Sequence, residues 1–198
     1  MKKILFASMV LALMFGRVAL PAPREMENMV LFRTLGVDTD TFTASSGRSE
    51  EKSEDLTAQG ENLKQGKKQL QTRSDSTVFL GYVDHVLVGE ELVRAGLSPL
   101  LDQMSRDGEL GLGARIWMVK GETAQAGVES GGEDGVDRRL NTLRLSGTET
   151  KTAGEVWADL LDRGTAQVTA LELRDGLLTP CGWAVLEGDR LIGFLETQ

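Results

Sequence analysis

Residues 78–95 read VFLGYVDHVLVGEELVRA, and this stretch decides the fold class. Its first part, residues 78–88, is rich in β-branched and aromatic residues and predicts a central strand. Because this part is long for one strand, Gly81 is interpreted as a β-bulge within it. Its second part, residues 89–95, predicts a helix with two glutamates in the first turn, where carboxylates favour the positive end of the helix dipole. We therefore expect a buried strand that leads directly into a helix.

Downstream of this stretch, helices and strands are predicted in mixed order. A second helix begins at Ser98, because Pro99 fits the first turn of a helix. Residues 114–119 (ARIWMV) predict another core strand. Residues 121–135 are poor in large apolar side chains and include VESGGEDG, so they predict a loop that supplies no core.

The last part of the chain predicts one helix followed by β structure. Thr152 with Glu155 three residues later is the pattern of a capping box, and Gly164 is a plausible helix stop. Three strands follow, at residues 167–173, 181–186 and 190–195. The last two are expected to form a hairpin around Glu187, Gly188 and Asp189.

Upstream of the central stretch, the pattern predicts two strands, a loop and a surface helix. The strands are residues 26–37 (MENMVLFRTLGV) and 39–44 (TDTFTA), and the loop is the polar segment 45–55. Residues 61–72 (ENLKQGKKQLQT) predict the helix. Since these elements do not alternate strictly as strand and helix, the fold class is α+β, a mixed β-sheet with packed helices.

Composition limits the classes of function. The 198 residues suit a single domain, and the net charge of -8 argues against nucleic-acid binding, which needs clustered Lys and Arg. Cys181 is the one cysteine, so the chain can form no intramolecular disulfide and no cysteine-based zinc site.

The first residues have the pattern of a secretory signal peptide. Lys2 and Lys3 precede an apolar run at residues 4–15, which is shorter than the roughly 20 residues that span a bilayer. We predict a signal peptide over residues 1–22 and a single domain over residues 23–198. An uncleaved anchor is the alternative.

No residue pattern predicts a catalytic, cofactor or metal site. His85 beside Asp84 lacks a neighbouring nucleophile motif, so we interpret it as a structural histidine. Glu90 and Glu91 are adjacent on a helix and point about 100 degrees apart, so they suit a helix start better than an acid–base pair. Cys181 has no basic neighbour to lower the pKa of its thiol, and we expect it to act as a small buried side chain.

Two further segments resemble binding motifs only in part. Residues 108–113 (GELGLG) lack the Lys-Ser/Thr of a phosphate loop. Arg106 and Asp107 are expected to pair with each other at a solvated helix end.

Several segments together resemble the Ger(x)C family, the C subunits of spore germinant receptors. Arg24-Glu25-Met26 followed by VLFRTLGVD is similar to the family's opening. Residues 60–110, from GENLKQ through VGEELVRAGL to the Arg106-Asp107 pair, are similar to its most recognisable stretch. IWMVKGETA and WAVLEGDRLIGFL are similar to its following strand and to the closing hairpin of its N-terminal domain.

The resemblance implies a non-enzymatic accessory subunit, exported and held at the spore membrane, that works with membrane-embedded receptor subunits. The segment before Arg24 lacks the lipobox cysteine of the family, so a lipid anchor is not expected. We also expect the chain to correspond to the family's N-terminal domain without its C-terminal domain. The alternative function is a stand-alone secreted domain that binds a ligand or a protein, and a hydrolase built on His85 is a third possibility.

Overall fold

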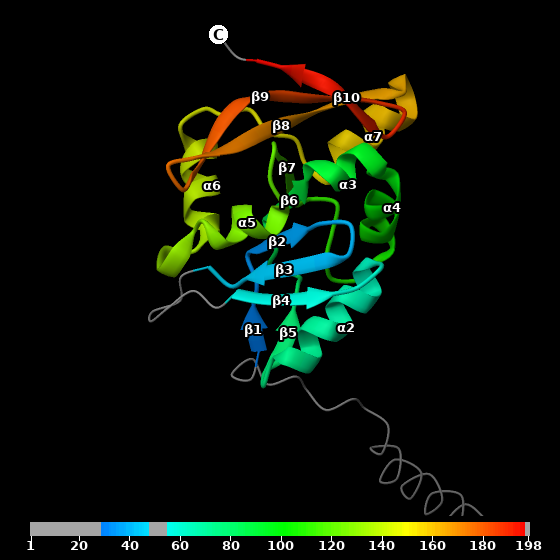
Figure 1. The fold of residues 1–198 in the computed structure, drawn as a ribbon. Coiled ribbons are helices and arrows are strands. Elements are labelled where there is room, and N and C mark those ends of the chain that lie inside the picture. Colours follow the sequence, from blue (N-terminus) through cyan, green and yellow to red (C-terminus); the bar gives the residue numbers. More distant parts are fainter. Residues whose placement is uncertain (1–28, 48–54, 197–198) are drawn as a thin grey trace, which may run out of the picture.

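A mixed eight-stranded sheet forms the centre of the molecule (Figure 1). The structure is a computed structural model, and it describes residues 29–47 and 55–196. The predicted signal peptide, the first residues of the predicted strand 26–37 and most of the polar segment 45–55 lie outside the described residues. In the order β10-β9-β8-β7-β6-β2-β3-β4, the four strands from β8 to β2 run parallel to one another, and both flanks are antiparallel. The strands are β2 (Thr34–Val37), β3 (Thr41–Ser45), β4 (Asp55–Gln59), β6 (His85–Gly89), β7 (Arg115–Val119), β8 (Thr165–Arg174), β9 (Leu177–Glu187) and β10 (Arg190–Leu195).

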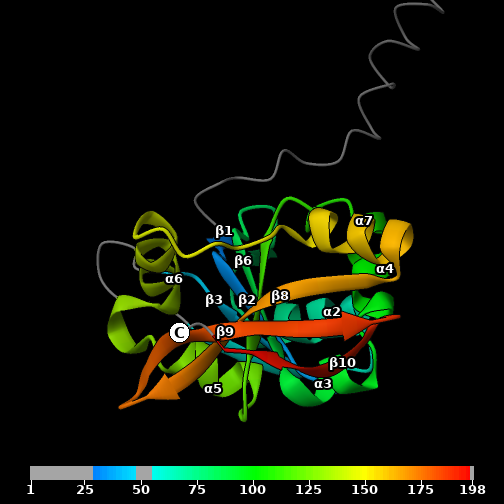
Figure 2. The same ribbon diagram turned by 90° about the horizontal axis from the view of Figure 1, so that it is seen from above.

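Helices cover both faces of the sheet. One face packs against α2 (Leu63–Arg73), α3 (Glu90–Ala95), α4 (Ser98–Arg106) and α7 (Ala153–Arg163), and the other against α5 (Ala124–Glu129) and α6 (Val136–Leu145). Viewed from above, α5 and α6 lie to the left of the strands and the other helices to the right (Figure 2). Both faces need cover because the strands are apolar on both sides. In β6, Val86 and Val88 face the larger core cluster, while Leu87 between them faces the smaller one. The predicted α+β class is therefore confirmed.

The predicted single strand over residues 78–88 is wrong. Two strands replace it, β5 (Thr77–Phe79) and β6, with a turn between them. At that turn, the ring of Phe79 covers Gly81 so closely that an added Cβ would lie 2.4 Å from it. β5 leaves the main sheet and pairs in parallel with β1 (Met29–Leu31). Gly81 thus marks a break in the chain direction and not a bulge.

The predicted loop over residues 121–135 is also wrong, since this segment forms α5 and a short 3-10 helix, Gly132–Asp134. Ala124 and Val128 are fully buried in the smaller core cluster. Small residues make this possible: a Cβ on Gly127 would lie 3.0 Å from Val119, and one on Gly36 would lie 2.9 Å from Val128. The segment therefore supplies core by close approach of the backbone and not by large side chains.

The predicted single strand over residues 26–37 is wrong, since its described part forms β1 and β2, which lie in different sheets. The remaining predictions hold in most places. The helices α2, α3, α4 and α7 and the strands β3 and β7 to β10 lie where the pattern predicts them, within a few residues. The strand β4 and the helix α6 were not predicted. In the described part of the chain, no helix is both long enough and apolar enough to cross a membrane. The domain limits, residues 23–198, stay a prediction.

Candidate functional site

A cleft of about 480 Å³ lies at the carboxyl ends of three parallel strands, and we call it the carboxyl-edge cleft. Asp38 follows β2, Glu90 follows β6, and the residues from Gly121 follow the end of β7. This edge of a parallel sheet is where open α/β sheets bind ligands, because the loops that leave the strands diverge there. The charged residues that line the cleft are Asp38, Asp40, Glu90, Glu91, Arg94 and Glu122.

Asp38 connects the floor of the cleft to α5. Its carboxylate accepts the backbone N–H of Ala124 at 2.8 Å and that of Gln125 at 3.0 Å, so it caps the first turn of this helix. Burial raises the pKa of the Asp38 carboxyl above its usual value, and the two backbone hydrogen bonds oppose that shift. A residue far upstream in the sequence thus stabilises the start of this helix together with the local N-cap Thr123, whose hydroxyl accepts the Ala126 N–H at 3.1 Å.

Glu90 connects the rim of the cleft to α3. One oxygen of its carboxylate accepts the backbone N–H of Gly121 at 2.8 Å, and the other pairs with Arg94 one turn later. Glu91, its neighbour, is exposed at the cleft surface. The predicted role of both residues at a helix start agrees with their position in the first turn of α3, and Glu90 also ties that helix to the loop after β7.

The cleft carries five carboxylates and a single guanidinium among its lining residues. Its lining contains no histidine, cysteine or serine that would act as a nucleophile or proton carrier. Within residues 29–47 and 55–196, no group of three or more His, Cys, Asp or Glu side chains is arranged to hold a metal ion. The arrangement is suited to attracting a cationic group to the cleft surface.

His85 lies at the other end of the parallel strands from the cleft, at the amino end of the central strand β6. It is 1% exposed, and its Nδ1 accepts the indole N–H of Trp117 at 3.1 Å. Burial lowers the pKa of His85 to about 4, although the nearby Asn141 and Asp84 act in the other direction. Asn141 lies close to the ring, but Nε2 forms no hydrogen bond of acceptable distance and angle to it or to any other described residue. His85 therefore has neither an open pocket nor a carboxylate partner.

Comparison with known proteins shows the family. The model of the spore germination protein N-terminal domain matches residues 23–131, which is 109 of the 198 residues. The chain belongs to the spore germination protein N-terminal domain family. The resemblance inferred from the sequence is thereby confirmed. Every residue that lines the carboxyl-edge cleft falls within the part that matches the family model.

Among solved structures, the GerBC protein is similar to this member of the family. The sequence identity is 15% and the TM-score is 0.45, with 82% of this chain and 51% of the GerBC chain covered. The chain therefore spans about half the length of GerBC. A comparison with curated proteins found no match.

Other candidate residues of this family member lie apart from the cleft. Asp84 pairs with Arg33 at 3.1 Å on the surface. Arg106 pairs with Asp102, one turn earlier in α4, so the expected pairing with Asp107 is wrong. Instead, the Asp107 carboxylate accepts two backbone N–H groups in the turn that follows, from Glu109 and Leu110, both at 2.8 Å. That turn occupies the glycine-rich residues 108–113.

Cys181 is half-buried in β9, where burial raises the pKa of its thiol. A raised pKa leaves less thiolate, which is the reactive form of cysteine. This environment favours an unreactive side chain, in line with the expectation from its sequence neighbours.

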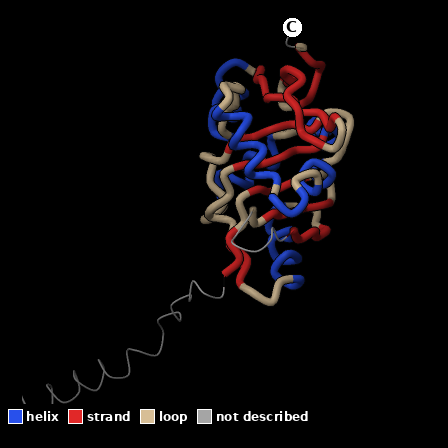
Figure 3. Tube along the Cα trace, turned by 90° about the vertical axis from the view of Figure 1, so that its left-hand side faces the viewer, coloured by secondary structure: helices blue, strands red, loops and turns tan. Residues whose placement is uncertain are grey.

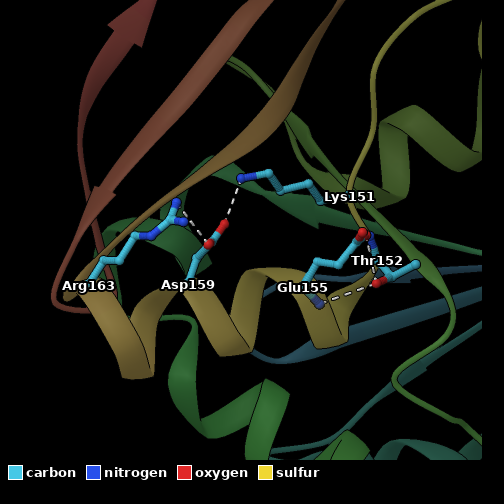
Figure 4. A network of polar contacts seen from close by, with 5 residues as sticks. All are labelled: Lys151, Thr152, Glu155, Asp159 and Arg163. Atoms are coloured by element: carbon cyan, nitrogen blue, oxygen red, sulfur yellow. Dashed lines mark hydrogen bonds and ion pairs between the residues drawn. The ribbon is translucent and has the colours of Figure 1, made fainter.

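A network of polar contacts at α7 lies outside the segment that matches the family model (Figure 4). The Thr152 hydroxyl and the Glu155 carboxylate form the predicted capping box. Asp159, one turn further, pairs with Lys151 at 2.6 Å and with Arg163 at 3.4 Å. The Lys151 hydrogen bond lowers the pKa of the Asp159 carboxyl. These groups already have partners, so we assign the network to helix stability.

Proposed function

We propose that the chain is a non-enzymatic accessory subunit of a spore germinant receptor and acts through protein–protein contacts at the membrane surface during germination. The observation that carries the proposal is the family match over residues 23–131, which contains the whole carboxyl-edge cleft. The partners would be the membrane-embedded subunits of the receptor. In this proposal the chain needs no cofactor and carries out no reaction.

The carboxyl-edge cleft is the surface on which we expect a partner to dock. Its carboxylates create a negative potential that speeds encounter with basic side chains and favours them over acidic ones. Glu91 and Glu122 are exposed and form no ion pair with another described residue, so they can meet a partner without disturbing the fold. Asp38 and Glu90, by contrast, hold α5 and α3 in place.

Affinity purification of the tagged full chain from membranes of sporulating cells tests the proposal. We expect a multi-spanning germination protein to co-purify with the wild type. Its absence would contradict the assignment as a receptor subunit and favour a stand-alone secreted binding domain instead.

A charge-reversal pair tests the cleft separately. Glu91→Lys with Glu122→Lys should weaken co-purification, because like charges then face the partner. Asp162→Lys with Glu187→Lys changes the net charge of the protein equally at exposed positions outside the cleft, and it should leave co-purification intact. Equal loss in both double variants would show that net charge, and not the cleft, governs the contact.

A further inference from the structure

The helix α2 is basic in an acidic protein. Residues 61–75 contain four basic residues, Lys64, Lys67, Lys68 and Arg73, and two acidic ones, Glu61 and Asp75, so their net charge is +2. Because the whole chain has a net charge of -8, the rest of the chain has a net charge of -10. Lys64 and Lys68 are exposed, and Lys67 pairs with Glu109 at 2.7 Å. Arg73, also exposed, donates to the backbone carbonyl of Thr57. This segment therefore has a net positive charge, whereas the rest of the chain has a net negative one.

An exposed apolar and aromatic patch lies on the small sheet beside α2. Leu31 of β1 is 41% exposed and lies opposite Phe79 of β5 in the register. The ring of Phe79 makes an edge contact with that of Tyr82, with centroids 5.7 Å apart, and Tyr82 is 49% exposed. The Arg33 guanidinium lies 5.9 Å from the centroid of the Tyr82 ring. Aromatic rings next to Arg are typical of groups that occupy the boundary between lipid headgroups and acyl chains.

Both features lie at one end of the molecule. The β1–β5 ribbon and α2 form the end opposite the β9–β10 hairpin, and the described chain begins there (Figures 1 and 3). The 28 residues before β1 include the apolar run 4–15 with Lys2 and Lys3 ahead of it. Residues 16–28 join that run to β1 and extend at most roughly 50 Å. The basic and aromatic end is thus directly connected to the most apolar segment of the chain.

We infer that this end, formed by α2 and the β1–β5 ribbon, rests on an anionic lipid surface and orients the domain on the membrane. The inference rests on the proposed function in assuming that the protein acts at a membrane. Lys64 and Lys68 meet the headgroups, and Leu31, Phe79 and Tyr82 reach the boundary below them. The carboxyl-edge cleft belongs to the acidic remainder of the chain and stays available to a protein partner.

Lipid fits this surface better than a protein does. The patch holds three large apolar side chains on a projecting ribbon, whereas a stable protein interface buries about 1,600 Å² with a well-packed centre. A small apolar patch beside exposed lysines is instead typical of peripheral membrane contacts, which need a second attachment. An acidic protein is repelled by anionic lipid, so the contact does not hold a free domain. It orients a domain that receptor subunits, or residues 4–15 in a chain that keeps its signal peptide, already hold at the membrane.

Fluorescence of the full chain in lipid vesicles tests the orientation. A Tyr82→Cys variant in a Cys181→Ala background carries an environment-sensitive label, and Leu161→Cys carries the same label on α7 as a control. We expect a blue shift and quenching by lipid-borne quenchers at position 82 in phosphatidylglycerol vesicles, and neither change at position 161. Equal signals at the two positions, or none at position 82, would overturn the inference. The vesicles contain no receptor subunit, so this failure would leave the proposed function standing.

Charge variants test the role of α2. Lys64→Gln with Lys68→Gln should reduce the quenching at position 82 severalfold, because each cation near an anionic surface contributes about a fivefold preference for it. Arg138→Gln with Arg163→Gln removes the same charge from α6 and α7 and should leave the quenching unchanged. Retained quenching in the α2 variant, or equal loss in both, would contradict a contact through α2.

Discussion

The buried His85 predicts a loss of stability in mild acid. The pKa of His85 falls from 6.5 to about 4 in the folded protein because the charged ring is removed from water. Protonation would also give Nδ1 a hydrogen that points at the indole N–H of Trp117, which lies 3.1 Å away. Between the two pKa values the unfolded chain binds one more proton than the folded chain, so the free energy of unfolding falls as the pH is lowered. Over this interval the loss is about 3 kcal/mol, at 1.36 kcal/mol per pH unit.

Urea unfolding followed by tryptophan fluorescence, at about pH 7 and about pH 4.5, measures this loss. The His85→Phe variant is the control, since it removes the titrating group and keeps an aromatic ring of similar size. We expect this variant to be less stable at neutral pH, because the Trp117 N–H loses its acceptor, and to lose less stability in acid. Burial also raises the pKa of the Asp38 and Asp137 carboxyls. These groups titrate alike in both proteins, so their effect on stability cancels in the comparison. Parallel pH dependence in the two proteins would refute the argument.

Three further changes in stability follow from the same structure and are measured by the same unfolding experiment. Thr152→Ala removes the hydroxyl of the capping box and should cost about 1 kcal/mol, whereas Thr152→Ser keeps it; equal stability of the two would contradict the cap. Gly66→Ala places a Cβ 2.4 Å from the ring of Phe42 and should cost about 1–3 kcal/mol. Gly108→Ala, with no atom within 4 Å of the new Cβ, should change stability by less than about 0.5 kcal/mol, and a similar effect at both glycines would argue against the crowding at Gly66. Asp38→Ala removes the acceptor of two backbone N–H groups of α5 and should cost about 1–2 kcal/mol, more than Asp38→Asn, which retains one acceptor oxygen.

The elements predicted well from the sequence are those with local signals. Thr152 and Glu155 predict both the start of α7 and the side chains that cap it, and Gly164 ends the helix with a positive φ of 68°. Pro99 lies in the first turn of α4, as predicted. The turn between β9 and β10 follows from the sequence between two apolar runs. In each case, residues within one turn of each other determine the conformation.

The errors arise where a distant residue determines the conformation. The helix α5 depends in part on the Asp38 carboxylate, which precedes Ala124 by 86 residues. Within residues 121–135 the local signal is Thr123, which caps the helix by accepting the Ala126 N–H and was overlooked in the sequence. The break after Phe79 depends on pairing of β5 with β1, which apolar content does not reveal. The helix α6 is a different case. Val136, Leu140 and Leu143 are spaced four and three residues apart, a helical pattern that was available in the sequence.

The carboxyl-edge cleft was not predicted from the sequence, although two of its residues were noted. Glu90 and Glu91 were singled out, but as a helix start alone. Asp38 and Glu122 lie 52 and 32 residues from Glu90 in the sequence, and the parallel register of β2, β6 and β7 brings all of them to one edge. Strand order is a property of the whole sheet, so the site follows from the topology and not from any motif.

The parallel centre of the sheet also has a consequence for how fast the protein folds. Thr34 pairs with His85, 51 residues later, and Trp117 pairs with Thr169, 52 residues later. Pairing across such separations gives a high contact order, which slows folding because long loops must close before the strands gain their partners. We expect the chain to stay unfolded for longer after synthesis than a helical protein of the same size. Slow folding would suit the predicted signal peptide over residues 1–22, because a chain that is still unfolded can pass through a narrow translocation channel.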